Sequence, residues 1–201
     1  MVNIKNKVIS IILFTSCIIF LLIFIIINKS DREKSIEAAL NFDKISNSRI
    51  IHEEPTGNGS IVFSIGSNNS NEFLSTAFVN KNLFGYKDLY SGTSSLDGLD
   101  IRDLTASYFP AIKQTSLPIY FGVIFKDEIQ SVAVKQNNSS KIKDAKIIEA
   151  DNKRIWLVYM EGFTGTEFEI VGYNKNNDSI YTFKDTFSWS VEQKPFKSPY
   201  E

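Results

Sequence analysis

Residues 8–27 form a run that is almost wholly apolar, and no other feature limits what the chain can be as strongly. Only Ser10, Thr15, Ser16 and Cys17 interrupt it. A hydrocarbon core of about 30 Å takes about 20 helical residues at about 1.5 Å each, which the run supplies. Hydroxyl groups inside such a helix can bond to its own carbonyls. The sequence therefore predicts a transmembrane helix over residues 8–28, after a short basic cytoplasmic head over residues 1–7.

Cys17 is the only cysteine of the chain, and it leaves two alternatives to an uncleaved anchor. In a lipoprotein attached through Cys17, Ser16 would be the small residue before the lipidated cysteine, but Phe14 fits that motif poorly. In a cleaved signal peptide, an apolar region of about 7–15 residues ends at a small-residue site. Because Ile18 to Ile27 stay apolar, the uncleaved anchor is favoured, with Cys17 as an apolar packing residue.

The charges that flank the run favour a cytoplasmic N-terminus. Lys5 and Lys7 precede the run while Lys29, Arg32 and Lys34 follow it, so the positive-inside counts nearly cancel. A short basic head before an apolar run is still typical of a signal-anchor. It predicts a single-pass protein of the cell membrane with an extracytoplasmic C-terminal domain. Abundant Ile, Lys, Asn, Ser and Phe, with no cysteine after the run, indicate a Gram-positive bacterium.

Residues 29–42 are predicted as a juxtamembrane helix, because Ser30 and Glu33 have the spacing of a capping box and apolar residues then share one face. Ten strand-like segments follow, four between residues 49 and 92 and six between residues 118 and 183. Polar turns join most of them, and residues 118–125 are continuously apolar, as in a strand buried on both faces.

The expected fold class is therefore mainly β with minor α (α+β), with an antiparallel sheet or small β-sandwich. It occupies residues 43–188, either as one unit or as two sub-parts, 43–110 and 116–188. An extended tail over residues 189–201 follows.

Four segments carry a resemblance to known proteins: "FVNKNLFGYKDLYSG", "PIYFGVIFKDEIQSVAV", "AKIIEADNKRIWLVY" and "FEIVGYNKNNDSIY". Together they resemble an uncharacterised group of small exported or membrane-anchored proteins of bacilli and related Gram-positive bacteria. Those proteins carry an N-terminal apolar segment followed by such strand blocks. The resemblance covers most of the exported part and implies an anchored β-rich protein. It implies no activity, and no functional residue is carried over from it.

Motifs of catalysis and cofactor binding are absent from the sequence. The single histidine, His52, has no G-x-S-x-G serine elbow to accompany it. A zinc site of cysteine and histidine lacks ligands, and neither a P-loop nor a dinucleotide-binding motif is present. There is no basic stripe of the kind that binds nucleic acid. We predict no cofactor, no metal and no nucleic-acid partner. His52 beside Glu53 and Glu54 could respond to pH, but a solvated strand residue is the favoured interpretation.

Carboxylates are the remaining route to catalysis or cation binding. A short helix is predicted over residues 96–109, since Ile101, Leu104 and Tyr108 follow helical spacing. This helix would bring Asp97, Asp100 and Asp103 to one face, where they could form a weak cation site. The simpler interpretation is that these acids stabilise the N-terminus of the helix through its dipole. A glycosidase pair could come from three further acids, for which a solvated sheet face is the favoured interpretation: Glu161, Glu167 and Glu169.

Aromatic residues near glycines and charges suggest a partner surface at Phe84, Tyr86 and Tyr90, with core packing as the favoured alternative. Two functions of different classes follow. The first is a non-catalytic anchored module that binds an envelope component or a membrane-protein partner. The second is a carboxylate-dependent hydrolase that acts on cell-envelope glycan.

Overall fold

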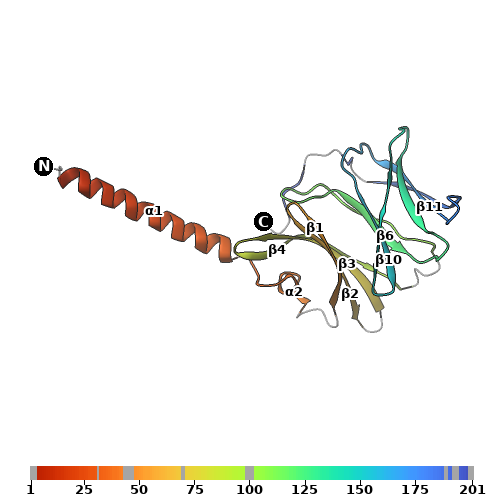
Figure 1. The fold of residues 1–201 in the computed structure, drawn as a ribbon, viewed down its shortest axis with the longest axis horizontal. Coiled ribbons are helices and arrows are strands. Elements are labelled where there is room, and N and C mark those ends of the chain that lie inside the picture. The colour runs from red at the N-terminus through yellow and green to blue at the C-terminus, as the bar shows by residue number, and fades with distance from the viewer. Residues whose placement is uncertain are drawn as a thin grey trace.

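The computed structural model describes residues 4–30, 32–42, 48–68, 71–97, 102–187, 190–191 and 195–198. They form one long helix, α1 (Ile4–Ser30), and a β-rich body from which α1 projects (Figure 1). α1 contains the predicted helix over residues 8–28 and also takes in the described end of the predicted basic head. Its stretch Lys7–Ile26 is long and apolar enough to cross a membrane, and none of that stretch is buried.

The described part of the body consists of a short helix, α2 (Ile36–Ala39), and three antiparallel sheets of four strands each. In spatial order, the first sheet contains β1 (Arg49–Thr56), β2 (Gly59–Asn68), β3 (Asn71–Asn82) and β4 (Gly85–Ser95). The central sheet contains β5 (Ser107–Phe109), β6 (Ile119–Ile124), β10 (Lys153–Tyr159) and β9 (Lys146–Ala150). The outer sheet contains β12 (Ser179–Thr186), β11 (Glu167–Tyr173), β7 (Ser131–Gln136) and β8 (Ile142–Asp144).

The central sheet is buried on both faces, because side chains of a strand alternate between two sides and each side here meets a core. On β6, Phe121 packs into the core shared with the first sheet, while Tyr120 packs into the core shared with the outer sheet. On β10, Leu157 and Trp156 divide in the same way. All six residues of β6 are buried, which confirms the predicted strand over residues 118–125.

The predicted fold class, mainly β with antiparallel sheets and an N-terminal helix, is confirmed. The ten predicted strands correspond to β1–β4, β6, β7 and β9–β12. β5 and β8, of three residues each, were not predicted. The sheets form three layers instead of one sheet or a two-layer sandwich. The two predicted sub-parts are packed together, since β5 of the first pairs with β6 of the second and both contribute to the core between the first and central sheets.

The juxtamembrane helix is much shorter than the one predicted over residues 29–42. Glu33 and Tyr86 of β4 pair through two backbone hydrogen bonds of 2.8 Å, so the chain after α1 first joins the sheet. The N-cap of α2 is Ser35 and not Ser30, and its side chain accepts a hydrogen bond from a backbone N–H of the first turn. α2 then packs on the outside of the first sheet.

The helix predicted over residues 96–109 is wrong for the part of it that the structure describes. Leu104 pairs with Ile124 as an isolated bridge, and the segment ends as β5. Leu104, Ala106 and Tyr108 all contact the core between the central and outer sheets. A spacing of four residues between apolar positions fits a strand period of two as well as a helical period of 3.6, so the pattern alone was ambiguous.

The predicted tail over residues 189–201 is attached to the body where the structure describes it. Val191 is buried in the core between the central and outer sheets. Phe196 forms an isolated bridge with Ile112, and the Ser198 hydroxyl donates a hydrogen bond to the Leu89 carbonyl of β4. The segment therefore runs back across the layers to the first sheet.

Gly122 of β6 leaves room for a hydrogen bond between Trp156 and the backbone of Thr105. The Trp156 Nε1–H donates to the Thr105 carbonyl at 2.8 Å, and a Cβ atom on Gly122 would lie 1.9 Å from that oxygen. We predict that Gly122→Ala lowers the free energy of unfolding by about 1–3 kcal/mol through overpacking, as measured by urea unfolding in detergent.

The matched control is Gly57→Ala in the β1–β2 turn, where nothing lies within 4 Å of an added Cβ. Its effect should stay within about 0.5 kcal/mol. Equal losses in the two variants would contradict the role given to Gly122.

Candidate functional site

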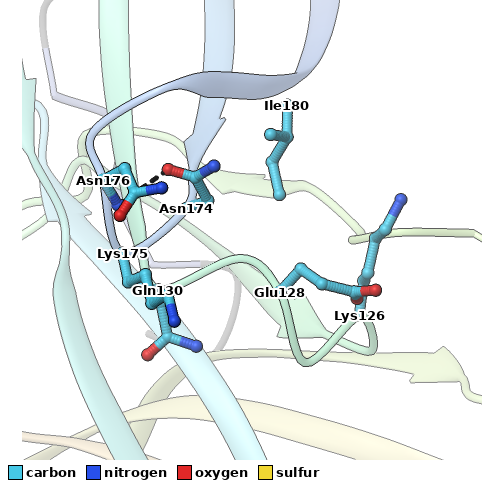
Figure 2. Close-up of a pocket in the computed structure, with 7 residues that line it drawn as sticks. All are labelled: Lys126, Glu128, Gln130, Asn174, Lys175, Asn176 and Ile180. Carbon is cyan, nitrogen blue, oxygen red and sulfur yellow. Dashed lines mark hydrogen bonds between the residues drawn. The ribbon is translucent and has the colours of Figure 1, made fainter.

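A hollow of about 510 Å³ lies at one end of the outer sheet, between two loops (Figure 2). We call it the polar hollow. The loop between β6 and β7 contributes Lys126, Glu128 and Gln130. The β11–β12 hairpin contributes Asn174, Lys175, Asn176 and Ile180. All of these side chains except Ile180 carry polar or charged groups, but the carbon stems of these side chains and Ile180 form most of the wall, so the hollow offers a few donors and acceptors on a largely apolar surface.

Hydrogen bonds inside each loop fix the walls of the polar hollow. The Asn174 Oδ1 accepts the backbone N–H groups of Asn176 at 2.8 Å and Asp178 at 2.9 Å, and its amide donates to the Asp178 carboxylate at 3.0 Å. On the other wall, the Gln130 amide donates to the Asp127 carbonyl at 2.7 Å. Such side-chain bonds to nearby backbone groups are typical of stable polar turns.

Three groups in the polar hollow keep their hydrogen-bonding capacity. Within the part of the chain that the structure describes, the side chains of Glu128, Lys175 and Asn176 make no hydrogen bond or ion pair. Figure 2 shows Glu128 on one loop and Lys175 and Asn176 on the other. A carboxylate, an ammonium group and an amide together can bind the hydroxyl and amide groups of a polar ligand.

A second hollow of about 450 Å³ lies at the open edge between β12 and the segment that precedes β5. Its lining includes Arg102, Tyr181, Phe183 and Asp185. Consecutive residues of β12 line the two hollows, Ile180 the polar hollow and Tyr181 the second. A further link is the ion pair, at 3.5 Å, between Lys126 of the polar hollow and Asp103, next to Arg102 of the second.

Two tyrosines lie under this edge, the buried Tyr120 and the half-buried Tyr108, and among the described residues only Tyr120 has a hydrogen-bond partner for its hydroxyl. The Tyr120 hydroxyl donates to the Asp185 carboxylate. Burial and this hydrogen bond raise the pKa of Tyr120 above its usual range. Burial, with a smaller contribution from Tyr90, raises the pKa of Tyr108 to about 12. The Tyr108 hydroxyl is buried without a partner among the described residues.

Two acids of the predicted cation site, Asp97 and Asp103, do not lie together on a helical face. Asp97 accepts the backbone N–H of Glu72 at 3.0 Å, and Asp103 pairs with Lys126. Asp100 lies outside the described residues. No cluster of three histidine, cysteine or acidic side chains that could hold a metal occurs within the described ranges.

The acids considered for a glycosidase pair lie on the surface of the outer sheet or its loops. Glu167 is exposed and Glu169 half-buried on β11, opposite the buried Phe168 and Ile170, as strand alternation predicted. Glu169 pairs with Lys135 of the neighbouring β7 at 3.8 Å, and Glu161 is exposed in a turn. Neither of the two hollows is lined by any of the three.

His52 belongs to a small charged cluster that joins two layers. Its Nε2 lies 3.2 Å from the Glu54 carboxylate, which also accepts from Lys146 of β9 at 2.6 Å. Burial would raise the pKa of Glu54, but the hydrogen bonds from Lys146 and His52 outweigh it and hold the pKa below its usual value. Glu53 accepts from the Ser60 hydroxyl of the same hairpin. This cluster ties the first sheet to the central sheet.

The three aromatics predicted as a partner surface have different surroundings. Tyr90 packs against the core between the first and central sheets, with its ring 4.8 Å from that of Phe109. Tyr86 packs against α2 on the outside of the first sheet. Phe84 is half-buried in the turn between β3 and β4, next to the fully exposed Leu83. They do not form one platform.

The comparisons with known proteins add no assignment: no family model matches the chain, and no curated protein or solved structure is similar to it. The candidate site therefore rests on geometry. Sequence reasoning missed the residues of the polar hollow, because the segments "KDEIQ" and "NKNND" are typical of turns. Their common feature is that each follows a buried strand, but the pairing of β11 with β7 that brings them together is not visible in sequence.

Tyrosine-to-phenylalanine substitutions should separate the two buried hydroxyls. Tyr120→Phe should lower the free energy of unfolding by about 1–2 kcal/mol, since it removes a hydrogen bond to a charged group. Tyr108→Phe should be neutral or stabilising, since it removes a hydroxyl without a partner. Urea unfolding measures both, and a larger loss for Tyr108→Phe would contradict the assignment.

The raised pKa values of these two tyrosines predict that the protein loses stability at alkaline pH. An unfolded tyrosine ionises near pH 10, whereas folded Tyr108 and Tyr120 ionise at higher pH. The unfolded chain therefore releases protons first, and the free energy of unfolding, unaffected below about pH 10, should fall as the pH rises toward 12. Unfolding at several pH values should show a weaker fall in Tyr120→Phe. An unchanged fall would show that Tyr120 is not involved.

Proposed function

We propose that this chain is a single-pass membrane protein, anchored by α1, whose β body lies outside the cytoplasm and binds a polar ligand without catalysing a reaction. The ligand is a component of the cell envelope, and the source is a Gram-positive bacterium. The anchor comes from the exposed apolar surface of α1, the binding role from the polar hollow, and the source from composition and the resemblance described above.

The observation that carries the anchor is an apolar helix of which no residue in the described stretch Lys7–Ile26 is buried. Phe14 is 68% exposed and Phe20 is 75% exposed, and their neighbours along the helix are similarly exposed. Water would make such a surface aggregate, whereas a bilayer of about 30 Å covers it completely. The hydroxyl of Thr15 bonds to the carbonyls of Ile11 and Ile12, so this polar group is satisfied inside the helix.

A non-catalytic body agrees with the distribution of its acids. Glu167 and Glu169 share the outward face of β11, but they and Glu161 line neither hollow, and each hollow has a single carboxylate in its lining, Glu128 in the polar hollow and Asp185 in the second. A binding site needs only fixed donors and acceptors, and the two loops, held by their internal hydrogen bonds, supply them. We therefore favour binding over the carboxylate-dependent hydrolase.

Substitution of Cys17 distinguishes a transmembrane anchor from lipid attachment through this cysteine. Cys17→Ser should leave the full-length chain in the membrane fraction after extraction at alkaline pH, because the helix and not a lipid holds it there. Intact mass of the wild-type product should equal that of the uncleaved chain. Release of the variant into the soluble fraction would instead support lipid attachment, and a product cut within residues 1–30 would support a signal peptide.

Protease added to intact cells tests the orientation. It should remove the β body and leave a short membrane-bound fragment. Full protection of the body in intact cells, with digestion after lysis, would place the body in the cytoplasm.

Binding can be tested with the full chain in nanodiscs and purified cell walls of a Gram-positive bacterium as the probe. The double variant Lys175→Ala with Asn176→Ala should bind these walls less than the wild type. The control pair Thr182→Ala with Lys184→Ala, exposed on β12 outside the polar hollow, should bind like the wild type. Equal binding by all three proteins would contradict a ligand site in the polar hollow.

A further inference from the structure

The turn between β3 and β4 carries the most exposed apolar side chain of the body. Leu83 is 100% exposed, whereas the next most exposed large apolar residue described in the body, Ile142, is 50% exposed. Phe84 follows it directly. The turn is stiff, since the Asn82 side chain accepts the backbone N–H of Phe84 at 2.8 Å. A fixed, fully exposed Leu beside a Phe is a costly surface in water.

This turn lies next to the end of α1. Three residues after Ser30, Glu33 pairs with Tyr86 through two backbone hydrogen bonds, and the Arg32 guanidinium donates to the Gly85 carbonyl at 3.3 Å. A Cβ on Gly85 would lie 2.3 Å from the Glu33 carbonyl oxygen, so the two segments are in close contact. Figure 1 shows the β3–β4 turn beside the C-terminal end of α1.

The hairpin also projects beyond its neighbour in the first sheet. The pairing of β2 with β3 ends at Ser60 and Val79, whereas β3 continues to Asn82 and pairs with β4 to the end. These extra residues extend the hairpin by about 10 Å at about 3.4 Å each. The neighbouring β1–β2 turn lies at the same end of the sheet, because the Asn80 amide donates to the Asn58 carbonyl.

Membrane dimensions place this turn at the lipid surface. If the apolar stretch ending at Ile26 fills the hydrocarbon core, the last four residues of α1 rise about 6 Å farther, through an interfacial region of about 5–8 Å. Tyr86 and Lys81, whose ammonium lies 5.2 Å from the Tyr86 ring centre, stand just behind the turn. Tyrosine and lysine are the residues that usually occupy this depth.

We propose that Leu83 and Phe84 insert into the interfacial region of the same membrane that α1 spans, as a second attachment of the body. This inference rests on the proposed anchoring through α1. Two attachments fix the tilt of the body, which a single helix followed by a short connection would leave free. The outer sheet, on the side of the body away from α1 in Figure 1, is then held away from the lipid.

Lipid contact can be measured on the full chain in vesicles of phosphatidylcholine and phosphatidylglycerol. In a Cys17→Ala background, an environment-sensitive fluorophore is attached after Leu83→Cys or, as control, after Ser140→Cys in the exposed β7–β8 turn of the outer sheet. The label at position 83 should emit at shorter wavelength and be quenched by spin-labelled lipid. The label at position 140 should be quenched by iodide instead.

Because such a label is itself apolar, a second measurement decides the result. Brominated lipids should quench the tryptophan introduced by Phe84→Trp more strongly than the one introduced by Ser140→Trp. Equal quenching would overturn the inference, whatever the label shows. Vesicle flotation distinguishes failure of the second attachment from failure of the anchor. Variants that float with the vesicles but keep the β3–β4 turn in water contradict only the second attachment. A chain that does not float contradicts both.

Discussion

The burial of the central sheet on both faces is the constraint on which the rest of the body depends. A sheet with two apolar faces is stable in water only when each face is covered. In this protein the first sheet covers one face and the outer sheet covers the other. The edge between β5 and β12, where the second hollow and the buried Tyr120 lie, exists only because two layers meet there. The second hollow is thus a product of the stacking.

Ion pairs at the edge of the first sheet complement its packing on the central sheet. Arg49 pairs with Asp151, Glu54 with Lys146 and Glu72 with Lys153. Each pair joins the first sheet to β9, to β10 or to the turn between them. Partly exposed pairs of this kind contribute little free energy each, so their main effect is to fix how the layers align. The apolar core between the layers supplies the stability.

The sequence predicts the strongly patterned parts of this structure well. The run at residues 8–27 and the continuous apolar strand at residues 118–125 each have a pattern that few structures satisfy. Predictions failed where the pattern fitted two structures: Leu104 and Tyr108 are spaced for a helix and equally for a strand. The capping pattern at Ser30 did not predict the start of a helix, because Glu33 pairs instead with Tyr86 of β4, a residue far away in the chain.

The candidate site was less predictable than the fold, for a related reason. Asp97, Asp100 and Asp103 were predicted as a cation site because they are close in sequence, yet Asp97 accepts the backbone N–H of Glu72 in β3 and Asp103 pairs with Lys126. The polar hollow instead joins residues 126–130 to residues 174–180. Turn-forming residues explain why each of these segments is a loop, but not why the two loops lie together. Sheet order, which sets these long-range neighbours, is not encoded in any local motif.

The order in which the strands enter the layers has a consequence for how the body comes apart. β1–β4 make the whole first sheet in one continuous stretch, whereas the strand pairs from β5 to β12 pass alternately between the central and outer sheets. Neither of these two layers can open without disrupting the chain of the other, so they form one cooperative unit. The first sheet shares no strand with the other two, so its detachment would leave Phe121 and Leu157 of the central sheet uncovered. Partial opening of this protein would therefore expose an apolar face of the central sheet, while the central and outer sheets stayed folded.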